Sequence, residues 1–377
     1  MRRTFKYRLY PTPAQETALS HILEECRWLY NRLLEERILA YEACDMSVGL
    51  YDQHARLPAL KLERPSLSDV HSQVLQNVAV RLDLAMKAFF RRVKTGEKPG
   101  FPRFRGAGRY DSFCYPQAGR KGGYWVADDG QSIYLSGIGM VPIILHRPLE
   151  GKVKTCCVRR TATGKWFVSF SCEFEAAPLP ATDAVVGIDV GLVSFATLST
   201  GGQIANPRFF RRDEKALAQV NHRLAKKVKG SPTWRKAKRA VSHVHDRIAN
   251  RRKDFAHQHS RRIVNQYSVV AVEDLRVNQM VHNHCLAKSI SDAAWGQFTE
   301  YLTYKAESAG RQVVKINPAY TSQDCSRCHH RQKITLAERV YRCSCCGLEM
   351  DRDENAALNI LALGLQSLGF APRSPLL

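Results

Sequence analysis

The sequence predicts an α+β protein of several domains, with a small antiparallel β-domain around a helical bundle, then an α/β domain that carries a four-cysteine ribbon. Three observations predict this class. Apolar residues recur at helical spacing in residues 19–38 and again in residues 74–93, and short strand-like runs follow between residues 112 and 175. From Asp183 onward, strand and helix patterns alternate up to two Cys-x-x-C motifs. With 377 residues, 44% of them hydrophobic, the chain has room for two or three packed domains.

Two amphipathic helices are expected in the first hundred residues. Leu19–Ile38 and Val74–Val93 repeat apolar side chains every three or four positions, so we expect the two helices to pack in one bundle. The stretch Lys94–Arg109 (KTGEKPGFPRFRGAGR) is rich in Gly, Pro and Arg and ends this region.

Strand-like runs then predict a small antiparallel β-domain. Val153–Val158 and Trp166–Phe174 are examples, and the opening segment Thr4–Leu9 has the same character. We expect the opening strand to complete this β-domain.

The charge of the chain is strongly positive and unevenly placed. Lys and Arg number 57 against 35 Asp and Glu, a net charge of +22. Arg208–Arg262 contains 18 Lys or Arg and four acidic residues, so +14 of this charge lies in one segment. Its apolar residues recur at helical spacing on both sides of Gly230 and Pro232, which predicts a basic helical hairpin. Nucleic acid is the expected partner, and two helices that merely face water are the alternative.

Secretion and membrane insertion are not supported. No apolar segment follows the N-terminal charges, and the longest nearly apolar run, Ile138–Leu145, is interrupted by Pro142. The 12 Cys are about 3% of the chain, well below the content of small disulfide-stapled proteins. We therefore expect a cytoplasmic protein whose clustered cysteines are metal ligands.

Three acidic residues lie at the ends of predicted elements. Asp189 ends the buried-strand run AVVGIDV, Glu273 ends the run SVVAVE, and Asp353 precedes the helix expected within DRDENAALNI. A carboxylate in such a position is costly unless something pairs with it. Carboxylates that converge at a sheet edge suit Mg²⁺, and two such ions support phosphodiester hydrolysis. Alternatively each acid is a helix cap or an ion-pair partner, which is the favoured interpretation for Asp351 and Asp274 taken alone.

The paired cysteine motifs predict a four-thiolate zinc ribbon. Their separation and the glycine after the second pair fit such a site, with the expected ligands Cys325, Cys328, Cys343 and Cys346. Cys345 could compete as a ligand, and disulfides are the alternative. A closed four-ligand zinc site holds structure, so this zinc is not the expected catalytic metal.

These motifs, in this order, resemble the transposon-encoded TnpB (OrfB) family, whose members are RNA-guided nucleases related to the type V CRISPR effectors. The resemblance covers nearly the whole chain and includes further segments: YRLYPTPAQ, KPGFPRFR, SISDAAWGQF and YKAESAGRQVVKINPAYTSQDCSRC. It implies a wedge-like β-barrel, an inserted helical recognition bundle, a RuvC-like nuclease domain of the RNase H fold, and a zinc ribbon inserted in that domain. The implied ranges are 1–10 plus 108–180, 11–107, 183–320 plus 351–377, and 321–350.

The resemblance also implies an activity and partners. The protein would cut double-stranded DNA beside a short target-adjacent motif, directed by a guide RNA from the transposon end, and support transposon maintenance in a prokaryotic cytoplasm. Asp189, Glu273 and Asp353 would hold catalytic Mg²⁺, expected as two ions, and the four cysteines would hold structural Zn²⁺. No membrane partner is implied, and the oligomeric state is left open.

Nucleic-acid contacts are expected at three places. Gln76 lies on the helix that would read the target-adjacent motif. Arg103 and Arg105 form a basic patch interleaved with aromatic residues, which either stacks on bases or anchors a loop. The hairpin supplies phosphate contacts through Lys226, Lys227, Arg235, Arg251 and Arg252.

Two other functions stay open on the sequence alone. A nuclease-inactive, RNA-guided repressor would bind DNA without cutting it, and it predicts the loss of an acid that this chain retains. A transposase proper would use the same acids for strand transfer.

Overall fold

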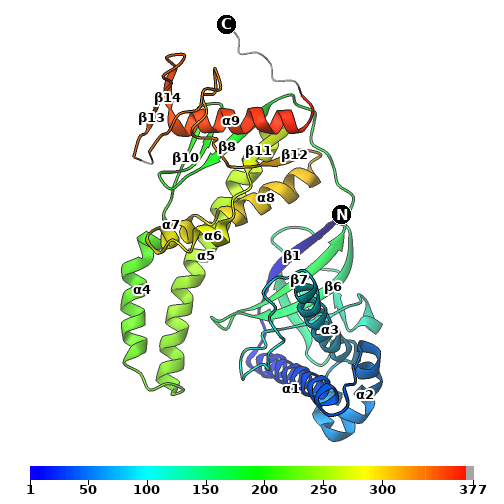
Figure 1. Cartoon of the computed structure of the whole chain (residues 1–377). Helices are drawn as coiled ribbons and strands as arrows, with labels where there is room; N and C mark the ends of the chain where they lie inside the picture. The colour runs from blue at the N-terminus through cyan, green and yellow to red at the C-terminus, as the bar shows by residue number, and fades with distance from the viewer. Residues whose placement is uncertain (336, 371–377) are drawn as a thin grey trace. The chain divides into compact units, whose positions relative to one another are not determined.

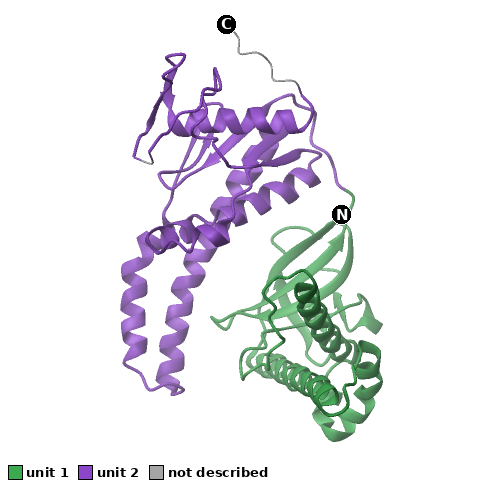
Figure 2. Ribbon diagram, viewed as in Figure 1, with its two compact units in different colours: residues 1–175 green, residues 176–377 purple. Residues whose placement is uncertain are grey.

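The computed structural model describes residues 1–335 and 337–370, which form two compact units, residues 1–175 and 176–377 (Figure 2). Residues 371–377 of the predicted nuclease domain and residue 336 of the predicted ribbon lie outside the described residues. In the described part of the chain, no helix is long and apolar enough to span a membrane.

A seven-stranded antiparallel sheet forms the body of the first unit, in the order β2-β6-β7-β1-β5-β4-β3. The first strand lies in the middle of this sheet and pairs with both β7 and β5, which confirms that the start of the chain completes the β-domain. The strands are β1 (Arg2–Leu9), β2 (Ser112–Tyr115), β3 (Tyr124–Val126), β4 (Ser132–Leu135), β5 (Gly139–Ile144), β6 (Lys152–Arg160) and β7 (Trp166–Glu173).

Three helices share one hydrophobic core with this sheet: α1 (Pro13–Cys44), α2 (Leu50–Glu63) and α3 (Ser72–Lys94). Helices α1 and α3 contact strand β2, whereas α2 packs on α3. Thr12 begins α1 as its N-cap and forms a capping box with Gln15. The predicted pair of helices is confirmed, because α1 and α3 pack together. The sequence analysis missed α2, where Pro58 interrupts the helical pattern. Short 3-10 turns lie at Pro65–Asp69 and Arg120–Gly122.

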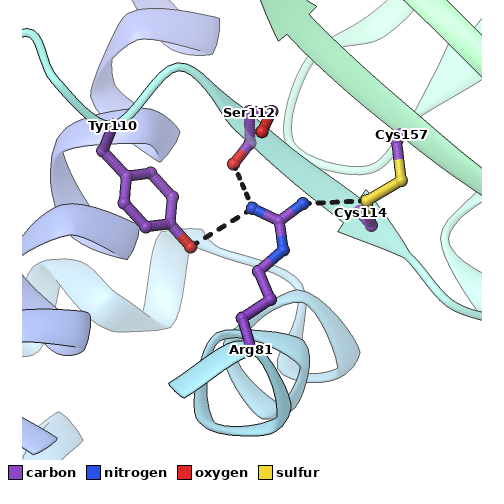
Figure 3. The surroundings of a disulfide bond; sticks show 5 residues. All are labelled: Arg81, Tyr110, Ser112, Cys114 and Cys157. Carbon is purple, nitrogen blue, oxygen red and sulfur yellow. Dashed lines mark hydrogen bonds between the residues drawn. A yellow bond between two sulfur atoms is a disulfide. The ribbon is translucent and has the colours of Figure 1, made fainter. Parts of the chain in front are cut away.

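A disulfide that the sequence analysis did not predict joins two neighbouring strands of this sheet. Cys114 of β2 lies opposite Cys157 of β6 in the strand register, and their sulfurs are bonded (Figure 3). Arg81 of α3 donates to the Cys114 sulfur at 2.9 Å and to the carbonyl oxygen of Ser112 at 2.6 Å. The two cysteines are 43 residues apart, and without the strand register nothing in the sequence pairs them.

The second unit contains a five-stranded mixed sheet in the order β10-β9-β8-β11-β12. Strand β11 is parallel to both of its neighbours, β8 and β12, whereas β8 and β9 are antiparallel. The strands are β8 (Val185–Val190), β9 (Ser194–Leu198), β10 (Gln203–Ala205), β11 (Val269–Glu273) and β12 (Gln312–Ile316).

The basic segment forms the predicted helical hairpin. The helices α4 (Phe209–Ala225) and α5 (Pro232–Gln266) run side by side and extend away from the sheet of their unit (Figure 1). The C-terminal part of α5 packs in the unit's hydrophobic core, where Ala256, Ile263 and Val264 are buried. The remaining helices before the ribbon are α6 (Val277–Met280), α7 (His284–Ala293) and α8 (Trp295–Ser308).

The last helix, α9 (Arg352–Ser367), lies directly against β8 and β11. Small residues permit this close contact, since a Cβ at Gly187 would lie 2.1 Å from the Ala357 carbonyl oxygen. A Cβ at Gly364 would lie 2.5 Å from the Cβ of Ala271. The ribbon precedes this helix and contains the antiparallel pair β13 (Val340–Arg342) and β14 (Glu349–Asp351).

This contact makes Gly187 sensitive to a single added methyl group. We expect Gly187→Ala to lower the free energy of unfolding by roughly 1 to 3 kcal/mol or more, because the new Cβ meets backbone atoms of α9 that cannot turn aside. Gly296→Ala is the matched control, since a Cβ there meets no atom within 4 Å. Urea denaturation of both variants measures the difference, and equal stabilities would contradict the close-contact argument.

Candidate functional site

Three elements of the second unit, β8, β11 and α9, bring the predicted acids together at the end of the sheet where β8 and β11 finish. We call this end of the sheet, with Asp189, Glu273 and Asp353, the acidic edge. Val272 pairs with Ile188 in the parallel register of β11 and β8, so the next residues, Glu273 and Asp189, follow at the same strand ends. Asp353 lies in the first turn of α9, which crosses both strands. All three side chains are half-buried. The fold therefore gathers residues separated by 84 and 80 positions in the chain.

The DRD segment divides two roles between its two aspartates. Asp351 caps α9, because its Oδ1 accepts hydrogen bonds from the backbone N–H groups of Asp353 at 2.9 Å and Glu354 at 3.0 Å. This confirms the helix-cap interpretation of Asp351. Asp353 was expected just before the helix but lies within it, since the cap is two residues earlier. The Arg352 guanidinium binds Asp353 Oδ1 at 2.7 Å.

The surroundings of the three carboxyl groups disfavour the state in which all of them are ionised. Burial, followed by the negative charges of Glu273 and Asp353, raises the pKa of Asp189 to about 7, while Arg352 acts in the opposite direction. Burial also raises the pKa of Glu273, and a hydrogen bond from Thr321 opposes that shift. A cation bound at this edge would remove the repulsion.

Thr321 is a positioning residue that the sequence analysis missed. Its hydroxyl donates to Glu273 Oε1 at 2.6 Å, and the side chain is 2% exposed. Its backbone carbonyl accepts a hydrogen bond from Asn359 of α9 at 2.8 Å. Nothing in the sequence distinguishes this threonine from its polar neighbours, because the contact depends on how the segment before the ribbon folds back to β11.

The three carboxylates fit divalent cations in chemistry, since hard oxygen ligands suit Mg²⁺. Their oxygen atoms are not as close together as the ligand atoms of a compact metal site. Within residues 1–335 and 337–370, only the four ribbon cysteines form a group of three or more such residues whose ligand atoms all lie within 4.8 Å of one another. Carboxylates that repel one another and share the edge with Arg352 are consistent with this looser arrangement.

The four predicted ribbon cysteines form the tighter site. The Cys325 and Cys346 sulfurs lie 3.6 Å apart, and those of Cys328 and Cys343 lie 3.5 Å apart. A tetrahedral zinc with Zn–S bonds of about 2.3 Å needs sulfurs about 3.8 Å apart, so the set fits zinc. A hydrogen bond from the Cys346 backbone N–H lowers the pKa of Cys343 to about 6, which favours the thiolate. Cys345 is exposed and outside this set.

Two buried asparagines of α9 connect the ribbon to the acidic edge. Asn355 donates to the Asp324 carbonyl oxygen at 2.8 Å and accepts from the Ser326 backbone N–H at 2.9 Å. Asn359, one turn later, donates to the same carbonyl at 2.6 Å. The helix that bears Asp353 therefore also holds the first cysteine knuckle.

Comparisons with known proteins agree with this arrangement. The family model of the OrfB proteins of IS605, described as "Probable transposase", matches residues 169–284, and a model of the Cas12f1-like TNB domain matches residues 295–360. A Streptomyces pristinaespiralis protein named "Putative RNA-guided DNA endonuclease" is 39% identical over 97% of this chain and 90% of its own length. The chain belongs to the TnpB (OrfB) family.

Other proteins are also similar to this TnpB-family chain in sequence or in fold. The Escherichia coli protein InsQ, whose name carries the same description, is 32% identical over 96% of the chain and 92% of its own length. A solved structure of the mini RNA-guided endonuclease CRISPR-Cas phi3 shares the fold, with a TM-score of 0.52 and 9% identity over 100% of this chain and 94% of that one. A helix-turn-helix family model matches residues 1–45, which form β1 and the single helix α1 here.

The hairpin residues predicted to bind nucleic acid fall into two groups. Lys226, Lys227 and Arg235 are exposed near the hairpin tip. Arg251 instead pairs with Asp213, and Arg252 pairs with the buried Asp292 at 2.7 Å. These ion pairs give the second group a structural role, and its contact with nucleic acid stays a prediction.

The residues predicted in the first unit also differ among themselves. Gln76 is exposed on α3 and Arg103 is exposed in the stretch after it. Arg105 is tied to α1, because its backbone N–H and C=O bind the Asn31 side chain and its guanidinium lies 5.5 Å from the centre of the Tyr30 ring. Phe101 packs edge-on against Phe89 of α3 at 5.2 Å. Phe101 therefore contributes to anchoring the loop, and base stacking by this patch stays a prediction.

The raised pKa of Asp189 predicts how the stability of the metal-free protein depends on pH. A carboxyl whose folded pKa exceeds its unfolded value near 3.8 stabilises the fold at low pH, and this contribution is lost as the pH rises through about 7. In EDTA at pH 8, Asp189→Asn should therefore raise the free energy of unfolding, by on the order of 1 to 3 kcal/mol. The gain should vanish near pH 4.

Denaturation of wild type and variant at each pH measures this difference. Asp274→Asn, at an exposed neighbouring carboxyl, is the control and should change little at either pH. A gain that does not vary with pH would contradict the electrostatic origin.

The zinc site predicts a difference between two neighbouring cysteines. Cys343→Ser removes one of four ligands and should reduce the zinc content from about one ion per chain toward zero, with faster proteolysis of residues 321–350. Cys345→Ser should keep the zinc, because that sulfur lies outside the set. Metal analysis of the purified proteins distinguishes them, and zinc loss in the Cys345 variant would show that the ligand set is wrong.

Proposed function

We propose that this protein is an RNA-guided DNA endonuclease encoded by an insertion-sequence transposon. The observation that carries the proposal is the gathering of Asp189, Glu273 and Asp353 at one sheet edge, in a chain whose relatives are named as RNA-guided DNA endonucleases. Guide RNA from the transposon end and target double-stranded DNA are its proposed partners. Cutting beside a short target-adjacent motif would serve transposon maintenance in a prokaryotic cytoplasm.

Each residue of the edge has a separate task in this proposal. Asp189 and Glu273, at the ends of adjacent strands, and Asp353, in the first turn of α9, would hold Mg²⁺ through their carboxylate oxygens. When bound, two Mg²⁺ ions lower the pKa of an attacking water and neutralise charge on the cleaved phosphodiester. Thr321 fixes the orientation of the Glu273 carboxylate through its 2.6 Å hydrogen bond. Arg352 keeps a positive charge beside Asp353.

The other parts of the chain would bind and position the nucleic acids. The net charge of +14 in Arg208–Arg262 would offset the repulsion between a phosphate backbone and the three acids of the same unit. Residues 11–107 would act as the recognition bundle, with Gln76 facing the target-adjacent motif. The wedge-like barrel, the nuclease domain and the ribbon would follow the ranges given by the resemblance.

Asp189→Ala tests the catalytic assignment. The variant should bind guide RNA and target DNA with affinities close to those of wild type, while DNA cleavage falls by several orders of magnitude, because one metal ligand and not a binding surface is lost. Gel assays with Mg²⁺ and with RNA that co-purifies with the protein measure both properties. Cleavage at the wild-type rate would contradict the assignment, and sequencing the co-purified RNA tests its transposon-end origin.

The same experiment separates the two other functions. A nuclease-inactive repressor would show wild-type DNA binding without any cleavage, although all three acids are present here. A transposase, the description carried by the matched family model, would join strands without RNA. We expect double-strand breaks that require RNA.

A further inference from the structure

A basic cavity lies beside the acidic edge and is not explained by the metal site. Its volume is about 480 Å³, and it is lined by the turn after β8, by the start of α4 and by α7. Figure 1 shows α7 at the base of the α4–α5 hairpin, where the hairpin joins the rest of its unit. Three cationic side chains, Arg208, Arg211 and Lys288, contribute to its walls.

The positive charges in the cavity wall exceed the nearby negative ones. Arg208 has no ion-pair partner among the residues that the structure describes, while Arg211 and Lys288 share the single carboxylate of Glu214. The one acid in the wall, Asp292, is already bound to Arg252 and to the Phe210 backbone N–H. An anion entering the cavity would therefore meet cations that lack a full set of counterions.

The backbone that presents Arg208 is held in an unusual conformation. Arg208 has φ 47° and ψ 51°, the left-handed region that a non-glycine residue adopts only at a cost. Asn206 holds this turn, because its Oδ1 accepts from the Arg208 backbone N–H at 3.2 Å and its amide donates to the Leu192 carbonyl oxygen at 2.9 Å. The same asparagine thus links Arg208 to the turn that follows Asp189.

The position of the cavity limits which phosphate it could hold. Leu192, in its wall, is three residues beyond Asp189, so their Cα atoms are at most about 11 Å apart. Along one strand of a duplex the charges are spaced by about 3.4 Å of helix axis. With the added reach of the side chains, a phosphate in the cavity would lie within several nucleotides of the phosphate that is cut.

We propose that this cavity binds a backbone phosphate of the DNA strand being cleaved, close to the cleavage position, through Arg208, Arg211 and Lys288. The proposal rests on the nuclease function proposed above and adds a substrate-positioning site to it. Guanidinium groups suit a phosphate because they bind its oxygens in a forked geometry. The contact reads no sequence, so it positions the strand and does not select the target.

The double variant Arg208→Gln/Lys288→Gln tests the site in a full chain that also carries Asp189→Ala, so that binding is measured without cleavage. For a synthetic single-stranded DNA, we expect about tenfold weaker binding than the Asp189→Ala parent, independent of sequence, and a log-log salt slope smaller by about 0.7. Lys288→Arg keeps the charge and should keep the affinity. Arg2→Gln/Arg159→Gln, at two exposed arginines paired with Glu173 and Asp111 in the other unit, removes the same number of charges and should match the parent.

A second measurement locates the phosphate. In cleavage-competent chains, neutral methylphosphonate linkages are placed one at a time within five nucleotides of the cut. One position should slow the wild type about tenfold and leave the double variant unaffected, because the variant has already lost that contact.

The possible results are distinct. Unchanged DNA affinity and salt slope in the double variant, in a protein that cuts DNA normally, would overturn this inference alone. Weaker guide-RNA binding with unchanged DNA binding would also overturn it, by assigning the phosphate to the RNA. If the wild type cuts no DNA with any co-purified RNA, the proposed function fails, and the binding series still reports on the cavity.

Discussion

The contact of α9 with β8 and β11 is the constraint on which the candidate site depends. Gly187 lets the helix backbone approach the strand, and the same helix carries Asp353 at its start and the two asparagines that hold the ribbon. A bulkier residue in the strand would displace all of these together. The ribbon therefore contributes to the acidic edge indirectly, because a folded knuckle at Cys325 fixes one end of the contacts made by Asn355 and Asn359.

The electrostatics of the second unit divide into two opposing regions. Burial, together with the neighbouring acids, raises the pKa of Asp189 to about 7, so the acidic edge favours any cation that can share its carboxylates. The hairpin and the cavity at its base carry the opposite charge and favour phosphates. In the proposed function, the second region would hold a nucleic-acid strand while the first receives one of its phosphates, which neither region could achieve alone.

Much of this arrangement could be predicted from the sequence. Long apolar patterns identified α1, α3, the hairpin and the central strands, and the Cys-x-x-C spacing identified the four sulfurs that the fold brings together. The sequence did not reveal α2, Thr321 or the Cys114–Cys157 disulfide. Pro58 interrupts the local helical pattern of α2. Thr321 and the disulfide depend on contacts between segments far apart in the chain, for which local periodicity carries no signal.

The different roles of Asp351 and Asp353 follow from their hydrogen bonds in the structure and not from their spacing in the sequence. Either carboxylate could have served the metal site by spacing alone. Asp351 caps α9, because its Oδ1 accepts hydrogen bonds from two backbone N–H groups of the helix. Asp353 instead binds the Arg352 side chain, which a cation can replace. The cap fixes the first turn of the helix, and the first turn fixes Asp353 at the sheet edge. One aspartate thus positions the other, and their roles could not be exchanged without moving the start of the helix.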